Sequence, residues 1–530
     1  MSRYARATVG VVGLGPTGAS FTWHLLRALA VRPCGGPLRI TMIDPSAELG
    51  AGYAFRSKHR LNMRADTLSI DPGRPGHFAS WLKGSGQSDC PESSYPPRAQ
   101  FGRYIVQMLD HAITAASAPD LEIEHWQAHA VDIEDSGDSL LVTGSDGRQR
   151  AFGILVLTLG ESRYNALSHY SGERNFIDSS WATSQLEDIP EDAAVAVAGT
   201  SLSAVDACIQ LLDQGHQGNI ACLSRTRGFP KVQGPCEDYE PQILTDSWLK
   251  QAAVPGGAPV RLRQVISALK EELEYCMGAP YDPGAIDPRE WFSADGVELR
   301  GKRTENEVFR DSVVQAGKSH TRWYYALDSL SPITPRVWNV LAKRDQTRFL
   351  RHYRAAWNEY RHSMPMVNAS RLLPSADAGQ LIIRSGLRSL GPASRRAARW
   401  IAVTGPAGHE EAYDFLIDAT GGQNDIACQR EPLLQACVRR GLAKLDPRGG
   451  LQVTFDSCRL VDASGQARNN LYFVGPLTFG THFYTNSFET NRDNAYRVAA
   501  EIEQVLRSNR PGPYSVQEAH SRAAEGEGDG

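Results

Sequence analysis

The spacing of hydrophobic and polar residues predicts strands that alternate with helices along most of the chain. Short apolar runs that end in glycine or polar residues are typical of buried parallel strands, and longer stretches with a 3.6-residue period are typical of helices. Two strand, helix, strand units stand out, each of the kind that builds a parallel sheet. Their elements are expected at residues 7–14, 19–29 and 38–43, and at residues 193–198, 202–212 and 220–224.

The rest of the chain follows other patterns. Amphipathic helix patterns rich in aromatic residues fill residues 240–370, which indicates a helical insertion. The last folded unit pairs a strand at residues 471–474 with a helix after Phe488, and the Gly/Glu-rich residues 511–530 are expected to be a disordered tail. Further strands are expected at residues 152–159, 381–383, 400–403 and 415–419.

Composition narrows the class of protein. The 530 residues are 41% hydrophobic and 22% charged with a formal net charge of -4, so the chain is an ordinary globular protein without a basic surface for nucleic acid. Its nine cysteines lie far apart with no Cys-x-x-Cys pair or clustered Cys/His spacing, so neither a metal site nor a dithiol redox centre is expected. The first apolar run is too short for a signal or a membrane span, and we expect a cytoplasmic protein that does not use a membrane.

The sequence GLGPTG at residues 13–18 directly follows the first strand and precedes the first helix. Gly13 permits a tight turn, Gly15 lets the backbone approach a pyrophosphate, and Gly18 lets helix and strand pack closely. Asp44, at the end of the next strand, is placed to accept hydrogen bonds from ribose hydroxyls. The alternative is a glycine-rich turn beside an ordinary strand-end aspartate. The residues expected to hold the dinucleotide are Gly13, Gly15, Pro16, Thr17, Gly18 and Asp44.

A second, weaker glycine motif follows the strand at residues 193–198. Gly199, Thr200 and Ser201 open the next helix, but Ser201 replaces the middle glycine of the full motif. Arg225 and Arg227 come just after the next strand, where arginines favour the 2'-phosphate of NADPH over NADH. The alternative is that both arginines are solvated loop charges.

Several segments resemble a family of bacterial FAD/NAD(P)-binding flavoproteins, and the resemblance covers most of the chain. In that family the N-terminal glycine motif holds FAD and a Leu-Asn segment lies near the flavin, which implies the same for Leu61 and Asn62. The segments that carry the resemblance are LGAGYA (residues 49–54), HRLNMRA (59–65), HF and WL (77–82), and PR and FGRY (97–104).

Two later segments extend the resemblance. NLYFVGPL looks like the closing flavin strand of two-dinucleotide flavoproteins, which implies that Gly475 and Thr478 approach the flavin, although Gly-Pro after a strand is also a common turn. YDFLIDATG resembles the strand and turn that end the nicotinamide domain of flavin monooxygenases and related reductases. Thr420 and Gly421 in this turn either touch a cofactor or only let the chain pass back to the flavin domain.

These features predict an α/β fold with two Rossmann-type, glutathione-reductase-like dinucleotide-binding domains. We expect an FAD-binding domain from residues 1–175 and 426–510. An NADP-binding domain is expected at residues 176–425, with the helical insertion at about residues 240–370.

The expected cofactors, FAD and NADPH, limit the chemistry. Without a dithiol relay, a disulfide reductase is disfavoured. The order of domains is similar to that of N-hydroxylating, class B-like flavin monooxygenases, which implies oxidation of the nitrogen of a small polar amine or amino acid by O2 through a flavin C4a-hydroperoxide, in natural-product biosynthesis. Two alternatives remain: an NADPH-dependent flavin reductase or dehydrogenase, and a non-catalytic FAD-binding protein. Self-association of the chain is left open.

Two clusters are candidates for the substrate site. His482, Tyr484 and Asn486 follow the closing flavin strand directly, so their position in the chain places them near the flavin. Arg322 and Tyr325 lie in the helical insertion and suit the anchoring of a small anionic substrate. The alternatives are that His482 only caps a helix and that the insertion residues serve helix packing.

Overall fold

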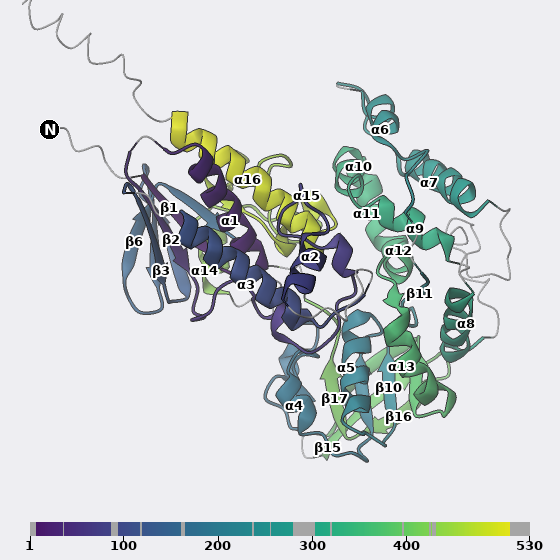
Figure 1. Ribbon diagram of the computed structural model, residues 1–530. Coiled ribbons are helices and arrows are strands. Elements are labelled where there is room, and N and C mark those ends of the chain that lie inside the picture. The colour runs from purple at the N-terminus through teal and green to yellow at the C-terminus, as the bar shows by residue number, and fades with distance from the viewer. Residues whose placement is uncertain are drawn as a thin grey trace, which may run out of the picture.

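The computed structural model describes residues 7–34, 36–85, 94–116, 119–160, 165–235, 238–254, 256–278, 303–318, 321–394, 397–422, 426 and 431–508. These residues form a mixed α/β fold with two mainly parallel sheets and a separate group of helices (Figure 1). The residues expected to form a disordered tail, 511–530, lie outside the described residues.

The first sheet is built from both ends of the chain. Strand β1 lies between β2 and β7, and β19 pairs with the other edge of β7, all in parallel. This confirms the strands expected at residues 38–43 and 471–474. The sheet order is β18-β19-β7-β1-β2-β3, with β1 (Ala7–Val12), β2 (Leu38–Ile43), β3 (Leu121–Trp126), β7 (Ile154–Leu157), β18 (Arg459–Val461) and β19 (Ala467–Phe473).

Helices α1 (Pro16–Val31), α3 (Arg98–Ala115) and α16 (Phe488–Ser508) cover one face of this sheet (Figure 1). Helix α1 packs between the other two, so the last helix of the chain contacts the first. The other face packs against α14 (Pro432–Arg439) and an antiparallel sheet. That sheet consists of β4 (Ala130–Asp135), β5 (Leu140–Gly144) and β6 (Gln149–Phe152).

The strand expected at residues 152–159 is in fact two strands of different sheets. The chain breaks at Gly153, whose N–H donates to the Thr8 hydroxyl (2.8 Å) between β6 and β7. A continuous apolar run hid this break, because Phe152 at the end of β6 and all four residues of β7 are buried. The helix expected from residue 19 begins earlier, at Pro16, because proline suits the first position of a helix.

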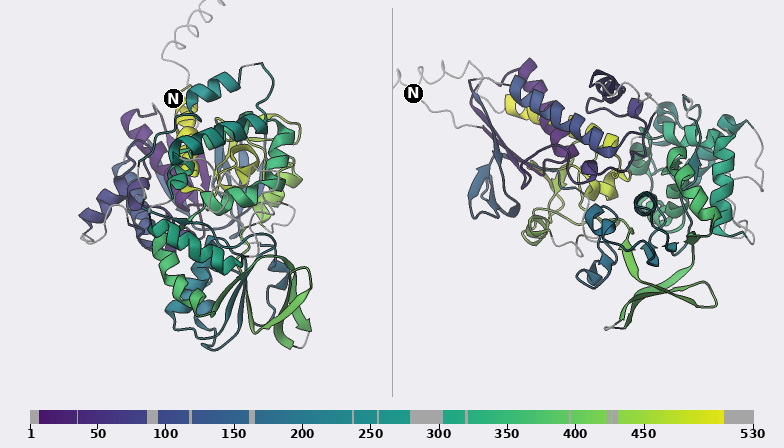
Figure 2. Two further views of the ribbon diagram at one scale, coloured as in Figure 1. Left: turned by 90° about the vertical axis from the view of Figure 1, so that its right-hand side faces the viewer. Right: turned by 60° about the horizontal axis from the view of Figure 1, so that its bottom comes forward.

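The second sheet is wholly parallel, in the order β13-β10-β9-β17-β8. Its strands are β8 (Phe176–Ile177), β9 (Val195–Ala198), β10 (Ile220–Leu223), β13 (Leu381–Arg384) and β17 (Phe415–Asp418). The helices of this unit are α4 (Thr183–Glu187), α5 (Leu202–Asp213), α8 (Glu305–Gly317) and α13 (Met366–Asp377). An antiparallel sheet projects from the unit, green in Figure 2: β14 (Leu387–Ser394), β15 (Ala397–Thr404) and β16 (His409–Tyr413).

The described helices of residues 240–370, apart from α8, form a group of their own, the insertion. Its status as an insertion into an NADP-binding domain stays a prediction. The insertion has its own core around the fully buried Trp323 and Tyr360 and joins the second unit through strands β11 (Val232–Gln233) and β12 (Met364–Pro365). Its helices are α6 (Asp246–Ala252), α7 (Leu262–Met277), α9 (Arg322–Ser329), α10 (Thr334–Val340), α11 (Lys343–His352) and α12 (Arg354–Arg361). Among the helices of the described residues, none is long and apolar enough to cross a membrane.

A buried ion pair joins the two sheet units. Arg98 at the start of α3 contacts Asp206 of α5 at 2.7 Å, and the two side chains are 8% and 4% exposed. The Arg98 guanidinium also lies over the Trp181 ring at 4.5 Å, and His59 shares a 3.1 Å hydrogen bond with Gln210. Since breaking a buried pair leaves an uncompensated charge, this contact fixes how the units sit relative to each other.

Candidate active site

The first glycine loop has the geometry of an anion-binding turn at the carboxyl end of β1. Gly13 has φ +88°, and a Cβ at Gly18 would lie 2.1 Å from the Gly13 carbonyl oxygen, so both positions require glycine. Helix α1 starts after Gly15 with no side-chain cap. A Cβ at Gly15 would meet only the Gly52 Cα, at 3.7 Å, which leaves room for a ligand at the helix N-terminus.

Asp44 shapes this loop from the end of β2. Its carboxylate accepts hydrogen bonds from the Leu14 N–H (2.7 Å) and from the Ser46 N–H (2.8 Å). These bonds hold the loop in place and still leave the carboxylate oxygens further acceptor capacity. The predicted contact of Asp44 with a ribose remains a prediction.

Buried polar atoms without partners lie in the segment that resembles flavoproteins. The Asn62 Oδ1, the His59 Nδ1 and the Ser57 hydroxyl are buried and have no hydrogen-bond partner among the described residues. Leu61 between them is 5% exposed. Because such atoms are costly to leave unpaired, this segment fits a polar ligand such as a dinucleotide.

The closing strand leads back to the end of β7. Gly475 follows β19, and a Cβ there would lie 2.9 Å from the Leu159 carbonyl oxygen. Thr478 is fully buried, and its hydroxyl donates to the Gly475 carbonyl at 2.9 Å. The hydroxyl of Thr478 is therefore already used within its own turn, and its expected approach to the flavin remains untested.

The second glycine loop lies at the carboxyl end of β9, beside the end of β17. A Cβ at Gly199 would lie 2.4 Å from the Ala419 carbonyl oxygen, so only glycine fits there. Ser201 caps α5 without a side-chain hydrogen bond and is exposed. Thr420 donates its hydroxyl to Asp418 (2.6 Å), and Gly421 follows at φ +78°. The helix N-terminus is thus open, whereas Thr420 mainly holds the turn.

The two predicted arginines differ in their surroundings. Arg227 contacts the buried Glu359 at 2.8 Å, and Glu359 also contacts the buried Lys231 at 2.9 Å. Arg225 is exposed and forms no ion pair with a described residue. The charge of Arg225 also acts on Arg354, an exposed residue whose pKa is lowered by partial desolvation and by that charge. An anion would relieve the repulsion between Arg225 and Arg354, so this pair suits a phosphate.

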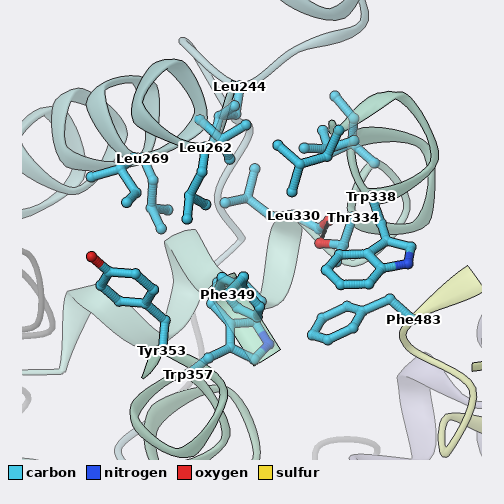
Figure 3. A pocket seen from close by; sticks show the side chains of 15 residues that line it. Leu244, Leu262, Leu269, Leu330, Thr334, Trp338, Phe349, Tyr353, Trp357 and Phe483 are labelled. Carbon is cyan, nitrogen blue, oxygen red and sulfur yellow. Dashed lines mark hydrogen bonds between the residues drawn. The ribbon is translucent and has the colours of Figure 1, made fainter. Parts of the chain in front are cut away.

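The segment after α15 (Phe479–His482) contains a strained turn. Phe483 has φ +58° and ψ -56°, and the Tyr484 N–H donates to the His482 carbonyl at 2.6 Å, which makes a γ-turn of the rare positive-φ type. The Phe483 ring stacks on Trp338 of the insertion at 4.7 Å (Figure 3). A bulky residue is held in such a conformation only where its surroundings enforce it, and such strain is concentrated at functional sites.

The three predicted residues of this segment lie in different surroundings. His482 is fully buried; its Nε2 lies 2.9 Å from the Phe455 carbonyl oxygen, its Nδ1 has no partner, and burial lowers its pKa to about 4. Tyr484 lies beside Arg361, whose guanidinium carbon is 4.8 Å from the ring centre. Asn486 is exposed.

The predicted residues of the insertion are not brought into this cluster. Arg322 is exposed at the start of α9. Tyr325 is 4% exposed, and its hydroxyl donates to the Pro235 carbonyl. Their expected role as a substrate site stays a prediction.

A partly open pocket of about 80 Å³ lies among the insertion helices (Figure 3). Phe483 and Trp338 form one side of it, and leucines of α7 and the aromatic rings of α11 and α12 form the others. A polar amine placed among these side chains would lose its hydrogen bonds to water without replacing them. The pocket is therefore a poor site for the amine itself.

Two cysteines that are distant in sequence meet in the second unit, which the spacing did not predict. The Sγ atoms of Cys208 in α5 and Cys222 in β10 lie 3.2 Å apart, and both side chains are fully buried. Burial, together with Cys208, raises the pKa of the Cys222 thiol well above its usual range. A neutral thiol without solvent access is a poor nucleophile, so this pair does not supply a disulfide relay.

The fold and its loops define an α/β protein built to hold dinucleotides, and the family model agrees. Residues 10–162 match the FAD-NAD(P)-binding family. This match supports the resemblance stated from the sequence and extends over residues 10–162, which include β1, α1 and the first glycine loop.

Individual proteins show a similar overall plan. The chain is 25% identical over 290 residues to the nitrosuccinate-forming L-aspartate N-monooxygenase of Streptomyces davaonensis, an alignment that covers 45% of this chain and 43% of that enzyme. It is 23% identical to the nitrosuccinic acid synthase of Aspergillus oryzae, over 90% of this chain and 89% of that protein. The solved L-lysine 6-monooxygenase of Pseudomonas syringae shares the fold, with a TM-score of 0.59 and 15% identity over 94% of this chain and 99% of that chain.

Proposed function

We propose that this protein is an FAD-dependent, NADPH-consuming monooxygenase that oxidises the nitrogen of a small polar amine or amino acid. The observation that carries the proposal is the position of residues 482–486. This segment leaves the first sheet directly after β19 and contacts the helical insertion through Phe483 and Tyr484. The two relatives at 23% and 25% identity are a nitrosuccinic acid synthase and an aspartate N-monooxygenase, and this supports the assignment.

We assign FAD to the first sheet and NADPH to the second. The first unit then comprises residues 1–175 and 426–510, and the second residues 176–425 with its insertion at about residues 240–370. The space above Gly15 and the unpaired Asn62 Oδ1 suit FAD. The uncapped N-terminus of α5 and the Arg225 and Arg354 pair suit the phosphates of NADPH.

Bound FAD, once reduced by NADPH, would supply the activated oxygen that an amine nitrogen takes up. The chain must hold the amine neutral and close by and must exclude water. His482 is neutral and desolvated, with a free Nδ1. The aromatic rings of Phe483 and Trp338 close the side of the segment toward the insertion. We assign His482, Tyr484 and Asn486 to this substrate pocket. We also assign the enzyme to natural-product biosynthesis, where reactive N-oxygenated products are used.

The test is NADPH oxidation by the purified holoenzyme with a panel of amines and amino acids, with and without O2. The proposal expects an N-oxygenated product that gains an oxygen atom from 18O2, formed in proportion to the NADPH consumed. Oxygen-independent reduction of a dye without such a product would identify a reductase. Absence of any NADPH-dependent flavin reduction would identify a non-catalytic FAD-binding protein.

A further inference from the structure

One guanidinium of the helical insertion is buried but only partly neutralised. Arg361, the last residue of α12, has a side chain that is 10% exposed. Its Nη1 lies 3.3 Å from an oxygen of Asp328, a carboxylate that is 37% exposed, and its Nη2 donates to the Ser331 hydroxyl. It donates no other hydrogen bond to a described residue, so most of its five N–H donors lack an acceptor.

Two other largely buried arginines, Arg98 and Arg448, have buried carboxylate partners, whereas Arg492 pairs with the exposed Asp493 but at a shorter 2.7 Å. Arg98 contacts Asp206 at 2.7 Å, and Arg448 contacts Asp446 at 2.5 Å. Both of these carboxylates are almost fully buried, with side chains 4% and 2% exposed. Arg361 instead has a longer contact with a carboxylate that water reaches, which leaves it able to take a second anion.

Tyr484, which packs against Arg361, also carries a donor without an acceptor among the described residues. The Tyr484 ring lies against the guanidinium at 4.8 Å, and its hydroxyl forms no hydrogen bond with a described residue. Burial raises the pKa of Tyr484 to about 12, so the phenol stays protonated at neutral pH. His362 completes the group with its ring 5.4 Å from that of Tyr484, and burial lowers its pKa to about 4. Arg361 and Tyr484 therefore offer donors to an anion.

Negative charge lies on another side of the same cluster. Glu489, in the first turn of α16, accepts a 2.6 Å hydrogen bond from the Ser487 hydroxyl and forms no ion pair with a described residue. Burial raises the pKa of Glu489, and its charge and that of Asp328 both act on Arg361. An ammonium group beside Glu489 would favour its charged form. A ligand with a carboxylate and an ammonium group would match both sides of the cluster.

We infer that Arg361 and Tyr484 bind a carboxylate of the substrate, while Asp328 and Glu489 face its ammonium group. Arg361 then determines specificity, because it selects an amino acid over an amine without a carboxylate. The inference rests on the proposed function for its substrate, but the binding of the amino acid can be measured without turnover. If Arg361 only ties α12 to α9, its removal will change stability and not specificity.

The test compares L-aspartate with its two monoamides, L-asparagine and L-isoasparagine, on wild-type holoenzyme and on Arg361→Gln. The dissociation constants come from calorimetry, and KM and kcat from product formation. We expect Arg361→Gln to raise the dissociation constant of L-aspartate about 10- to 100-fold. For the monoamide whose amide replaces the contacted carboxylate, the same substitution should weaken binding by less than about threefold, because that ligand does not make the contact in the wild type either. Arg361→Lys should recover part of the affinity, since it keeps the charge but not the planar donors.

Two results would overturn the assignment. One is an equal loss for L-aspartate and for both monoamides; the other is a wild-type holoenzyme that does not bind L-aspartate. The matched control is Arg336→Gln, which removes an arginine of α10 whose partner Asp246 is exposed, and which should leave all three constants unchanged. Failure of the proposed function is distinguishable, because it would appear as discrimination in binding without any N-oxygenated product.

Discussion

Single replacements of three arginines near the second glycine loop separate nucleotide choice from folding. Arg225 has no ion-pair partner among the described residues, and Arg354 is its neighbour. Arg225→Gln and Arg354→Gln should each weaken the binding of NADPH by about 1.5–3 kcal/mol, which raises its dissociation constant roughly 10- to 150-fold. This is the range for a hydrogen bond to a charged group. NADH, which lacks the 2'-phosphate, should change by less than about twofold.

Arg227→Gln should act on the fold instead. Its guanidinium lies 2.8 Å from Glu359, which is 2% exposed, and the variant would remove one of the basic side chains, beside Lys231, that balance that carboxylate. We expect the free energy of unfolding to fall by about 1–3 kcal/mol and the affinities for NADPH and NADH to fall together.

The assay is anaerobic stopped-flow reduction of the flavin, which gives the dissociation constants of NADPH and NADH for each variant, together with urea unfolding of the same preparations. Equal losses for both nucleotides in Arg225→Gln and Arg354→Gln would refute the phosphate site. A selective loss of affinity for NADPH in Arg227→Gln, with an unchanged free energy of unfolding, would show that Arg227 leaves Glu359 to bind the nucleotide.

Three further predictions concern the flavin, the substrate segment and pH. Gly15→Val should fold but lose flavin absorbance, because a Cβ at Gly15 would meet only the Gly52 Cα, at 3.7 Å, and the valine would occupy the place of the pyrophosphate. Full retention of FAD by this variant would contradict the assignment. His482→Ala should keep NADPH-driven flavin reduction while product falls and hydrogen peroxide rises, and Asn486→Ala, at an exposed side chain, should shift this ratio less; unchanged coupling in both would move the pocket elsewhere. Burial lowers the pKa of His24 and of His482 to about 4, against an ordinary 6.5, so the unfolded chain binds more protons than the folded one between these pH values. The free energy of unfolding should therefore fall as pH falls from 6.5 to 4, by up to about 3 kcal/mol for each histidine. Urea unfolding of His482→Gln should show a shallower dependence of this free energy on pH than wild type, and an equal dependence would refute this cause.

Much of the fold could be predicted because its main signals are local. The apolar run before Gly13 and the helix pattern after it predict β1 and α1 without reference to the rest of the chain. The same holds for β9 and α5 around Gly199. In the antiparallel sheets the strand expected at residues 400–403 is present within β15. Most of the other strands did not stand out, because they are partly exposed and their alternation is interrupted by register shifts, as between Ala130 and Asp132.

The candidate site was harder to predict, because its residues come together across long separations in the chain. No spacing rule joins Arg225 to Arg354, or Tyr484 to Arg361. A weak signal was present in α12, where Arg354, Trp357 and Arg361 follow helical spacing within one aromatic and basic stretch. The ion pair between Arg227 and Glu359 could not be predicted either. A solvated, a structural and a phosphate-binding arginine look alike in sequence.

The pairing of β19 with β7, and of α16 with α1, has a consequence for how the protein is made. The segment that matches the FAD-NAD(P)-binding family ends at residue 162, but the sheet it belongs to is complete only when Phe473 is in place, and its helical layer only when Ser508 is. At roughly 5–20 residues per second, the ribosome needs on the order of 20 to 70 s to cover that interval. During this time β7 has an unpaired edge and α1 an uncovered apolar face. An unpaired strand edge and exposed apolar surface favour association between chains, so this interval is the stage of synthesis at which the protein is most prone to aggregate.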